Sequence, residues 1–496
     1  MVKRAEGVLL ESITIDRAAH QPLGLQIGAG LRALIFGGAL KPGQRLPATR
    51  TLAREFGVAR ATVVETFERL VAEGLLVTRV GDGTYVGEVL AADRPAPAAP
   101  PRVAAIAQAR LAQAMADATS RFGARLAHEP RPFTTALPAF DAFPASQWSG
   151  IVSRHWRRPR HAALGYPDPQ GYEPLRRAIA THLQVNRGIT CAWQQIFITA
   201  GAQQAFQVIA ATLIDAGDKV WFENPGAIGA RNSFVMHGAD LVAVPVDEQG
   251  LVVQRGLELA PEFRLVFTTP SHQQPLGSKL SLDRRRALLD AAEAAGAWII
   301  EDDWDGELCF AGRPLPTLRG TDVSGRVIYV GSFSKTLFPS LRLGFLLAPP
   351  ALAGHLRISV EACSPGVPTA LQAGAASFIS DGHFDTHVRR MRRLYAERYQ
   401  RLAAAAATWL APWLDLVPTN TGMHTIARLK PGLDADAISA AAAQRGVTAA
   451  PLSRFCLAPV AGQGAVLVLG FSGFTPGQID SAARLLAEVL HGLAPR

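Results

Sequence analysis

Lys335 stands in a context that suits covalent chemistry with a phosphorylated aldehyde. It lies in the segment 331–336 (GSFSKT), directly after the apolar run 327–330. A lysine amine forms a Schiff base with an aldehyde, while hydroxyl and guanidinium groups bind phosphate. The neighbours that could hold the phosphate are Ser332, Ser334 and Arg342. We therefore expect Lys335 to carry a phosphorylated aldehyde cofactor.

Two more segments place polar groups where strands are expected to end. In the segment 199–204 (TAGAQQ), a helical pattern begins and leaves the backbone N–H groups of Ala202 and Gln203 free to bind phosphate. In the segment 301–305 (EDDWD), a carboxylate can pair with a protonated ring nitrogen and keep the ring an electron sink. We assign both segments to the same predicted cofactor site as Lys335.

These segments belong to a region in which short β-branched runs alternate with helical patterns. The runs are 195–198, 219–222, 265–267, 298–300 and 327–330. Strands separated by helices favour a mostly parallel sheet that is covered on both faces. The sequence therefore predicts an α/β domain over residues 131–496.

Residues 20–87 show a different pattern, of helices joined by tight turns. Helices are predicted over 23–36, 49–56 and 60–73, with Thr49 as the N-cap of the second. The apolar face of the third is expected to comprise Val63, Phe67, Leu70 and Val71. The segment 75–86 then predicts two strands around a Gly-Asp-Gly turn. This order predicts a helix-turn-helix followed by a wing.

The composition limits the possible partners, metal sites and membrane segments. The chain has 496 residues, 48% hydrophobic and 18% charged, and a formal net charge of +9, which favours a polyanionic partner. Its four cysteines show no metal-ligand spacing, so no metal site is expected. The longest apolar stretch, 402–414, is too short to cross a bilayer. We expect a cytoplasmic protein without a membrane span, with residues 88–130 as an Ala/Pro-rich linker that contains a short helix near 103–118.

The N-terminal block resembles the GntR family of winged-helix repressors over about sixty-five residues. That resemblance implies binding to double-stranded operator DNA, in which arginines read guanine edges or grip phosphate and the glycines let the wing tip enter the minor groove. The implied and neighbouring DNA-contact positions are Arg45, Arg50, Arg60, Thr62, Gly81 and Gly83. For any single arginine, the alternative interpretation is a solvated surface charge.

The larger block resembles fold-type-I aminotransferases that use pyridoxal phosphate. Segment 166–176 resembles their substrate-gate segment, and segment 271–277 stands where they carry an Asn-Pro-x-Gly turn, in the correct order around Lys335. Winged helix, linker and aminotransferase-like domain together resemble the MocR-type regulators of the GntR family. The resemblance implies a large domain with a C-terminal α+β subdomain, which binds pyridoxal phosphate and an amine or amino-acid effector, forms a homodimer and controls the DNA-binding arms.

The same resemblance assigns individual roles. Asp302 faces the ring nitrogen, Trp304 stands where the family has a tyrosine that contacts the cofactor's hydroxyl, and Tyr166 contributes to the effector site across a dimer. Arg454 is the candidate for binding the effector's carboxylate. All eight cofactor-site candidates are thus Lys335, Asp302, Trp304, Ala202, Gln203, Ser332, Ser334 and Arg342.

The chain departs from the family pattern at several positions. Ala59 replaces the usual serine before the recognition-helix arginine, so a helix cap and a phosphate contact are lost. Ala227 stands where a ring-stacking tyrosine is common, and Gln274 replaces an aromatic residue. We expect these changes to alter cofactor affinity or orientation, or the class of effector.

Three functions remain open from the sequence. The first is a transcriptional regulator in which an amine, an amino acid or pyridoxal phosphate itself controls DNA binding. The second is an active aminotransferase with an accessory winged helix, which turnover would reveal. The third is a DNA-binding scaffold without a cofactor, for which a colourless protein that ignores added pyridoxal phosphate would be the sign.

Overall fold

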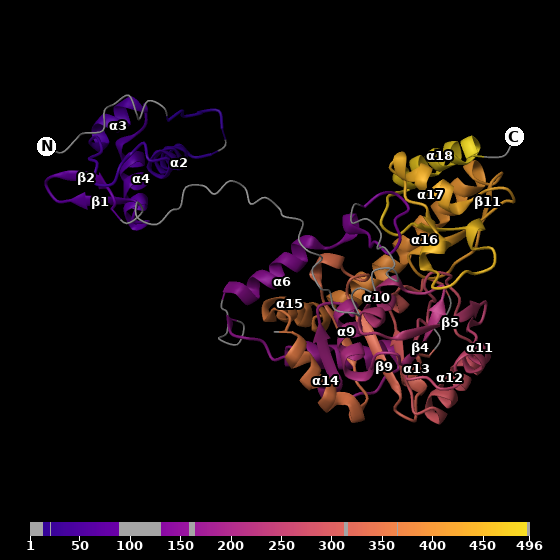
Figure 1. Cartoon of the computed structure of the whole chain (residues 1–496). Coiled ribbons are helices and arrows are strands. Elements are labelled where there is room, and N and C mark those ends of the chain that lie inside the picture. Colours follow the sequence, from indigo (N-terminus) through magenta and orange to yellow (C-terminus); the bar gives the residue numbers. More distant parts are fainter. Residues whose placement is uncertain are drawn as a thin grey trace. The chain divides into compact units, whose positions relative to one another are not determined.

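The computed structural model describes residues 13–19, 21–88, 130–157, 164–311, 316–364 and 366–493. The chain divides into two compact units, residues 1–110 and 111–496 (Figure 1). Except at its two ends, the linker predicted over 88–130 lies outside the described residues, as does the helix predicted near 103–118.

The N-terminal unit is a winged helix-turn-helix. Its elements are α2 (Leu23–Phe36), α3 (Thr49–Glu55), α4 (Arg60–Ala72), β1 (Leu76–Arg79) and β2 (Gly83–Val86). The two strands pair antiparallel, from Leu76 opposite Val86 to Arg79 opposite Gly83. The core comprises Ile27, Leu31, Leu52, Val63 and Leu70, all fully buried. The predicted order of elements is confirmed.

Two details of that prediction are wrong. Thr49 is the first residue of α3, and Ala48 takes the N-cap position without a side-chain hydrogen bond. Val71 does not share the buried face of α4 with Val63, Phe67 and Leu70, because 36% of it is exposed. In an α-helix Val71 is turned about 100° away from Leu70, and this places its side chain at the edge of the buried face.

The large unit is built on an eight-stranded, mostly parallel sheet. Its strand order is β3-β10-β9-β8-β7-β4-β5-β6. The strands are β3 (Ile196–Thr199), β4 (Lys219–Asn224), β5 (Asp240–Asp247), β6 (Gly250–Leu251), β7 (Leu265–Thr268), β8 (Trp298–Asp302), β9 (Val327–Ser332) and β10 (Gly344–Leu347). Strand β10 runs antiparallel to both β3 and β9, and β6 runs antiparallel to β5. The other pairs are parallel.

Both faces of this sheet are buried. In β7, Leu265 and Phe267 join one apolar cluster while Val266 joins another, and Ile299 and Ile300 of β8 divide between the same two clusters. Alternate residues of a strand point to opposite faces, so each cluster marks one covered face. The helices of this part are α6 (Ala145–Arg157), α8 (Glu173–His182), α9 (Ala202–Leu213), α10 (Ile228–Met236), α11 (Val253–Leu259), α12 (Leu282–Ala294), α13 (Leu318–Thr321), α14 (Pro350–Cys363) and α15 (Thr369–Ser380).

A C-terminal α+β subdomain, orange to yellow in Figure 1, completes the unit. Its antiparallel sheet has the order β11-β12-β14-β13. The elements are α16 (His383–Trp409), β11 (Leu414–Leu416), β12 (His424–Leu429), α17 (Ala435–Gln444), β13 (Ala450–Pro451), β14 (Val466–Gly470) and α18 (Pro476–Leu493). The predicted α/β fold with this subdomain is confirmed.

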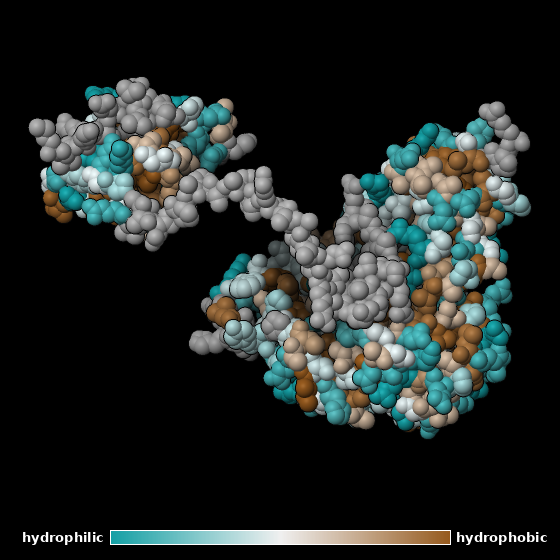
Figure 2. All heavy atoms as spheres, viewed as in Figure 1, coloured by the Kyte–Doolittle hydropathy of each residue, from teal (hydrophilic) through white to brown (hydrophobic). Residues whose placement is uncertain are grey.

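The surface mixes hydrophilic and hydrophobic residues on the face of the large unit that Figure 2 shows. Among the described helices, none combines the length and the apolar character that crossing a bilayer requires.

Candidate cofactor site and candidate DNA interface

Lys335 lies in the turn after β9 and faces a cavity of about 530 Å³. Its Nζ donates a hydrogen bond to the carbonyl oxygen of Ala136, at 3.0 Å. Removal from water lowers the pKa of the amine from 10.5 to about 8, although the nearby carboxylates of Asp302 and Asp305 act in the opposite direction. A larger fraction of the amine is therefore neutral, and nucleophilic, near neutral pH.

Asp302 ends β8 and is 5% exposed. Its Oδ1 is buried and has no hydrogen-bond partner among the described residues. Burial, together with the neighbouring carboxylates of Asp303 and Asp305, raises the pKa of Asp302 well above its ordinary value. A buried carboxyl oxygen without a partner is costly unless a ligand supplies one. Asp302 is thus suited to receive the N–H of a protonated ring.

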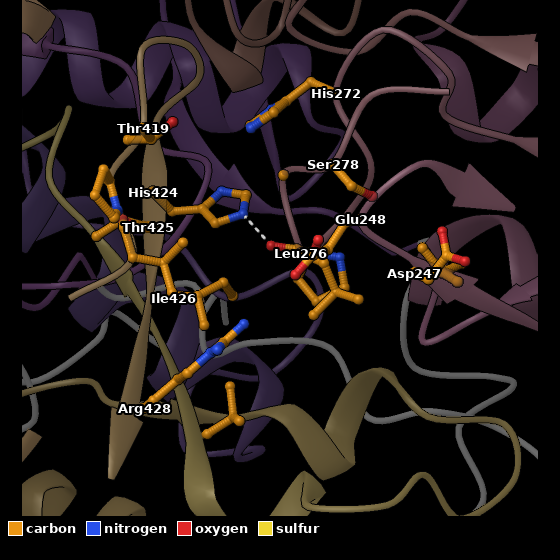
Figure 3. A pocket seen from close by; sticks show the side chains of 16 residues that line it. Asp247, Glu248, His272, Leu276, Ser278, Thr419, His424, Thr425, Ile426 and Arg428 are labelled. Atoms are coloured by element: carbon orange, nitrogen blue, oxygen red, sulfur yellow. Dashed lines mark hydrogen bonds between the residues drawn. The ribbon is translucent and has the colours of Figure 1, made fainter. Parts of the chain in front are cut away.

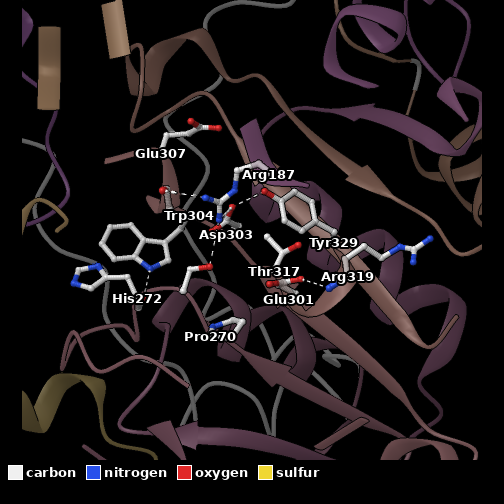
Figure 4. Close-up of polar contacts among 12 residues, drawn as sticks. Arg187, Pro270, His272, Glu301, Asp303, Trp304, Glu307, Thr317, Arg319 and Tyr329 are labelled. Carbon is white, nitrogen blue, oxygen red and sulfur yellow. Dashed lines mark hydrogen bonds and ion pairs between the residues drawn. The ribbon is translucent and has the colours of Figure 1, made fainter. Parts of the chain in front are cut away.

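The carboxylates around Asp302 have protein partners instead (Figure 4). Asp303 forms an ion pair with Arg187 at 2.5 Å, and the hydroxyl of Tyr329 donates to it at 2.5 Å. Glu301 accepts from the backbone N–H groups of Leu318 and Arg319, at 2.9 and 2.8 Å. Burial still raises the pKa of Glu301 to about 7. Each of these neighbours thus has partners, although Oδ1 of Asp303 lacks one, whereas the carboxylate of Asp302 has no hydrogen bond with any described residue.

The sheet register brings the predicted phosphate-binding groups together. Gly344 of β10 pairs with Ser332 on one side and with Thr199 on the other, so the ends of β9 and β3 lie at the same level. Arg342, which has a φ of 49°, donates to the carbonyl of Ala200 at 2.8 Å, next to the start of α9. An arginine beside free helix N–H groups makes an anion site.

The remaining members of this set have partners within the protein. The N–H of Ser334 donates to Oγ of Ser332 at 3.2 Å. The side-chain amide of Gln203 donates to the carbonyl of Gly229, at 3.0 Å, and to Ser233. The side-chain amide of Gln203 is therefore already engaged within the protein.

Trp304 does not present its N–H toward Lys335. The indole Nε1 donates to the carbonyl oxygen of His272 at 2.9 Å, and the side chain is buried. The indole ring packs against the rings of His272 and His424, with centroids 5.5 and 5.7 Å apart. A tryptophan at this position thus forms part of the core between the sheet and the C-terminal subdomain.

The two effector candidates lie in different places. Tyr166 is 96% exposed in this single chain. Arg454 lies in the short helix Leu452–Phe455, where burial lowers the pKa of its guanidinium, and the adjacent Phe455 lines the Lys335 cavity.

The sequence did not predict most of the cavity wall, because isolated threonines and apolar residues far from Lys335 in the chain give no chemical signal. That wall includes Thr134, Thr135, Ala136, Leu137, Phe140, Ile228 and Phe455. Gln274 also lines the cavity, whereas Ala227 is a buried residue at the N-cap of α10.

In the N-terminal unit, the candidate DNA contacts surround α4. Arg60 is the first residue of α4 and is exposed, as is Arg50 on α3. Thr62 lies in the first turn of α4. The wing glycines Gly81 and Gly83 have φ values of 79° and 127°, which side chains rarely adopt.

Arg45 connects this surface to the wing. It forms a bridge with Tyr85 of β2, and its guanidinium lies next to Gly83. The N-cap of α4 is Ala59, and no side chain caps the helix there. The loss of a cap that was expected from Ala59 in place of serine is thus visible in the structure.

Comparisons with known proteins agree with both units. Residues 23–86 match the family of bacterial regulatory proteins of the gntR type. Residues 155–484 match the family of class I and II aminotransferases.

Individual relatives span nearly the whole chain. The probable rhizopine catabolism regulatory protein MocR of Rhizobium meliloti is 41% identical over 94% of this chain and 93% of its own length. The pyridoxine biosynthesis transcriptional regulator PdxR of Corynebacterium glutamicum is 31% identical over 97% and 98%. Among solved structures, LysN, an α-aminoadipate aminotransferase of Thermus thermophilus complexed with a phosphopyridoxyl-leucine, superposes with a TM-score of 0.70 at 27% identity. It covers 77% of this chain and 99% of its own.

The large unit is therefore a pyridoxal-phosphate domain, and the residues present fit that cofactor. Lys335 would bind its aldehyde, Asp302 its ring nitrogen, and Arg342 with the start of α9 its phosphate. When bound, the cofactor supplies a reactive aldehyde and an electron-accepting ring. With a gntR-type winged helix joined to an aminotransferase-like domain and relatives of the same organisation along its length, the chain belongs to the MocR-type transcriptional regulators of the GntR family.

Proposed function

We propose that an amine or amino acid binds at Lys335, with pyridoxal phosphate in place, and thereby controls how this transcriptional regulator binds its operator. The observation that carries the proposal is the cavity at Lys335. It combines an amine of lowered pKa with apolar side chains that could enclose a small ligand, among them Phe140, Ile228 and Phe455. Such a site is suited to bind amines through the cofactor.

The chain segment nearest to the linker forms part of this cavity. Ala136 accepts the hydrogen bond from Lys335, and both Phe133 and Ala136 have positive φ values, of 67° and 60°. Such backbone conformations cost about 1–3 kcal/mol each and persist where the surroundings enforce them. The carbonyl of Phe133 accepts from Gly470 at 2.8 Å, which ties the segment to β14. An effector that displaces Lys335 from Ala136 would act directly on the segment that leads to the DNA-binding unit.

For the DNA-binding unit, we propose that Arg50, Arg60 and Thr62 contact the operator and that the wing enters the minor groove. The exposure of Arg50 and Arg60 and the place of Thr62 in the first turn of α4 support this assignment. A regulator that binds chromosomal DNA in bacteria works in the cytoplasm, which is where we place it.

We also propose a homodimer. Large apolar side chains are exposed in the single chain at Trp156, Leu164, Tyr166 and Ile358. Exposed apolar groups of this size favour burial against a partner. Light scattering on the full-length protein should give twice the chain mass, and a monomer that still binds the cofactor would overturn this assignment.

The test of effector control uses the full-length protein with pyridoxal phosphate and its operator. Amines and amino acids are titrated while cofactor absorbance and DNA-binding anisotropy are recorded together. We expect one class of compound to change both signals in the wild type and neither in Lys335→Ala, with Lys279→Ala as the matched control that behaves like the wild type. A change in DNA binding that survives in Lys335→Ala would overturn the proposal.

Two other outcomes identify the alternatives. If pyridoxal phosphate alone changes DNA binding and no amine adds to it, the cofactor itself is the effector. If the titrated amino acid is converted to its keto acid at ordinary enzyme rates, the chain is an active aminotransferase.

A further inference from the structure

A second cavity, of about 470 Å³, lies between the large sheet and the C-terminal subdomain (Figure 3). Its walls come from the turn after β5, from the loop 272–278, and from β12 with the turn before it. The cavity is separate from the one at Lys335, since the two share no lining residue.

Strand β12 supplies the polar wall. His424, Ile426 and Arg428 alternate along it and therefore share one face of the strand, and all three line the cavity. In Figure 3 the side chain of Arg428 extends from β12 into the cavity, toward the loop that carries Leu276.

One charge of each sign on this cavity lacks a partner in the described part of the chain. Arg428 and Glu248 both line the cavity, and neither side chain has an ion pair or hydrogen bond with any described residue. Asp247, beside Glu248, is different, because Arg284 binds both of its carboxylate oxygens at 2.5 and 2.6 Å. The cavity therefore offers one available cation and one available anion on its opposite walls.

His424 adds a buried acceptor. It is 3% exposed, and its Nε2 lies 2.8 Å from the carbonyl oxygen of Pro275, so Nε2 carries the proton and donates it. Burial lowers the pKa of His424 to about 3, which keeps the ring neutral. Its Nδ1 is then an unprotonated acceptor, and no described residue donates to it. A buried acceptor without a donor indicates a missing ligand or water.

We propose that this cavity is a second ligand site, which takes a small zwitterion with its carboxylate on Arg428 and its ammonium on Glu248. Arg428 belongs to the C-terminal subdomain and Glu248 to the turn between β5 and β6. A molecule with both charges would bridge the two, whereas an amine or a carboxylic acid alone would leave one charge unpaired.

The loop 272–278 connects this site with the cofactor site. Gln274 lines the Lys335 cavity, while Pro275 and Leu276 line the second one. His272 is a second link between the two cavities. It lines the second cavity, and its Nδ1 lies 2.7 Å from Asp305, whose charge acts on Lys335. Occupation of the second cavity should therefore alter the environment of the cofactor.

The experiment uses the full-length protein with pyridoxal phosphate fixed to Lys335 by borohydride, so that exchange at Lys335 is closed. Calorimetric titration with glycine, alanine, glutamate and β-alanine is compared with the matched amines and acids that carry one charge only. We expect one zwitterion to bind once per chain, and Arg428→Ala and Glu248→Gln each to weaken it at least about tenfold, as expected for loss of a hydrogen bond to a charged group. Arg393→Ala and Glu397→Gln, exposed on α16, are the matched controls and should leave binding unchanged.

Three outcomes would overturn the proposal: no zwitterion binds the reduced protein, a singly charged analogue binds as tightly, or the Arg428 and Glu248 variants bind like the wild type. Fluorescence of the reduced cofactor is followed in the same titration. Binding without a change in that fluorescence would overturn the coupling through the loop 272–278. None of these results depends on whether an effector acts at Lys335, which the test of the unreduced protein decides separately.

Discussion

The two units place their candidate functional residues in opposite surroundings. Around α4, Arg50 and Arg60 are exposed and carry their charges in water. Around Lys335, Asp302 and Asp305 are buried, and burial raises the pKa of both. Charges in water interact weakly and independently, whereas buried charges depend strongly on each other. Single substitutions of the exposed arginines should therefore affect binding alone, whereas the loss of one buried charge in the second unit should also change the pKa values or the ion pairs of its charged neighbours.

The largest effect is expected at Lys335. Lys335→Ala should abolish covalent attachment of pyridoxal phosphate and leave the fold intact, because a small apolar side chain replaces a partly buried amine that lines a cavity and has one hydrogen bond. Mass spectrometry after borohydride treatment measures the adduct. An adduct of unchanged yield in this variant would place the attachment on another lysine.

Arg187→Leu tests how strongly the buried charges depend on each other. Asp303 would lose an ion pair in which both side chains are almost completely buried. Breaking such a pair costs about 3–5 kcal/mol in the free energy of unfolding. Urea denaturation measures the loss. Arg445→Ala, which breaks an exposed pair with Glu488, should cost about 1 kcal/mol or less, and equal losses for the two variants would refute the contrast.

The pH dependence of cofactor attachment sharpens the same contrast. The pKa of Lys335 is lowered to about 8, so the neutral amine accumulates as the pH rises through 8 rather than through 10.5. The rate at which the cofactor-free protein gains cofactor absorbance should therefore rise with pH and level off above about 8. In Asp302→Asn the midpoint should fall further, because Asp302 raises this pKa. A rate that still increases steeply up to pH 10.5 would show an amine in ordinary surroundings.

Arg60→Ala tests the exposed region. If Arg60 reads a base, the change should weaken operator binding by about 1–3 kcal/mol and relax discrimination at one position. The free energy of unfolding should change by about 0.5 kcal/mol or less. Anisotropy with operator and scrambled duplexes measures binding. Arg69→Ala, at the other end of α4, is the control. An equal loss of operator affinity in Arg69→Ala would show that Arg60 contributes only general charge attraction to DNA.

The smallest effect is expected at the N-cap of α4. Ala59 has an extended conformation, with φ −64° and ψ 142°, and no side-chain hydrogen bond, so Ala59→Ser should stabilise the helix by about 1 kcal/mol. Hydrogen exchange in the first turn of α4 in the full-length protein should slow accordingly. Ala61→Ser, inside the helix, should not slow it. Unchanged exchange in Ala59→Ser would contradict the capping argument.

The sequence predicted what local patterns encode. The three helices and the wing of the N-terminal unit, and five strands of the large sheet, follow from periodicity and turn residues. It also placed Lys335, Asp302 and the start of α9 at strand ends, and the sheet brings the ends of β9 and β3 to one level.

What the sequence did not predict depends on contacts between distant segments. Strand β10 lies antiparallel between β3 and β9, and no local signal reveals that position. The hydrogen bond from Lys335 to Ala136 joins residues 199 apart in the chain. The packing of Trp304 on His272 and His424 likewise depends on how the C-terminal subdomain meets the sheet, which decides where the indole N–H points.

The exposure of Arg50 and Arg60 also has a meaning for how such a protein can evolve. A substitution at either position leaves the core of the N-terminal unit untouched, so if these arginines contact the operator as proposed, the set of operators can change one residue at a time. The carboxylates at the end of β8 allow no such gradual path, because Asp303 is tied to Arg187 and Asp305 to His272. Under that proposal, single mutations could give access to new target genes, whereas a change at Asp303 or Asp305 would require a compensating change in its partner.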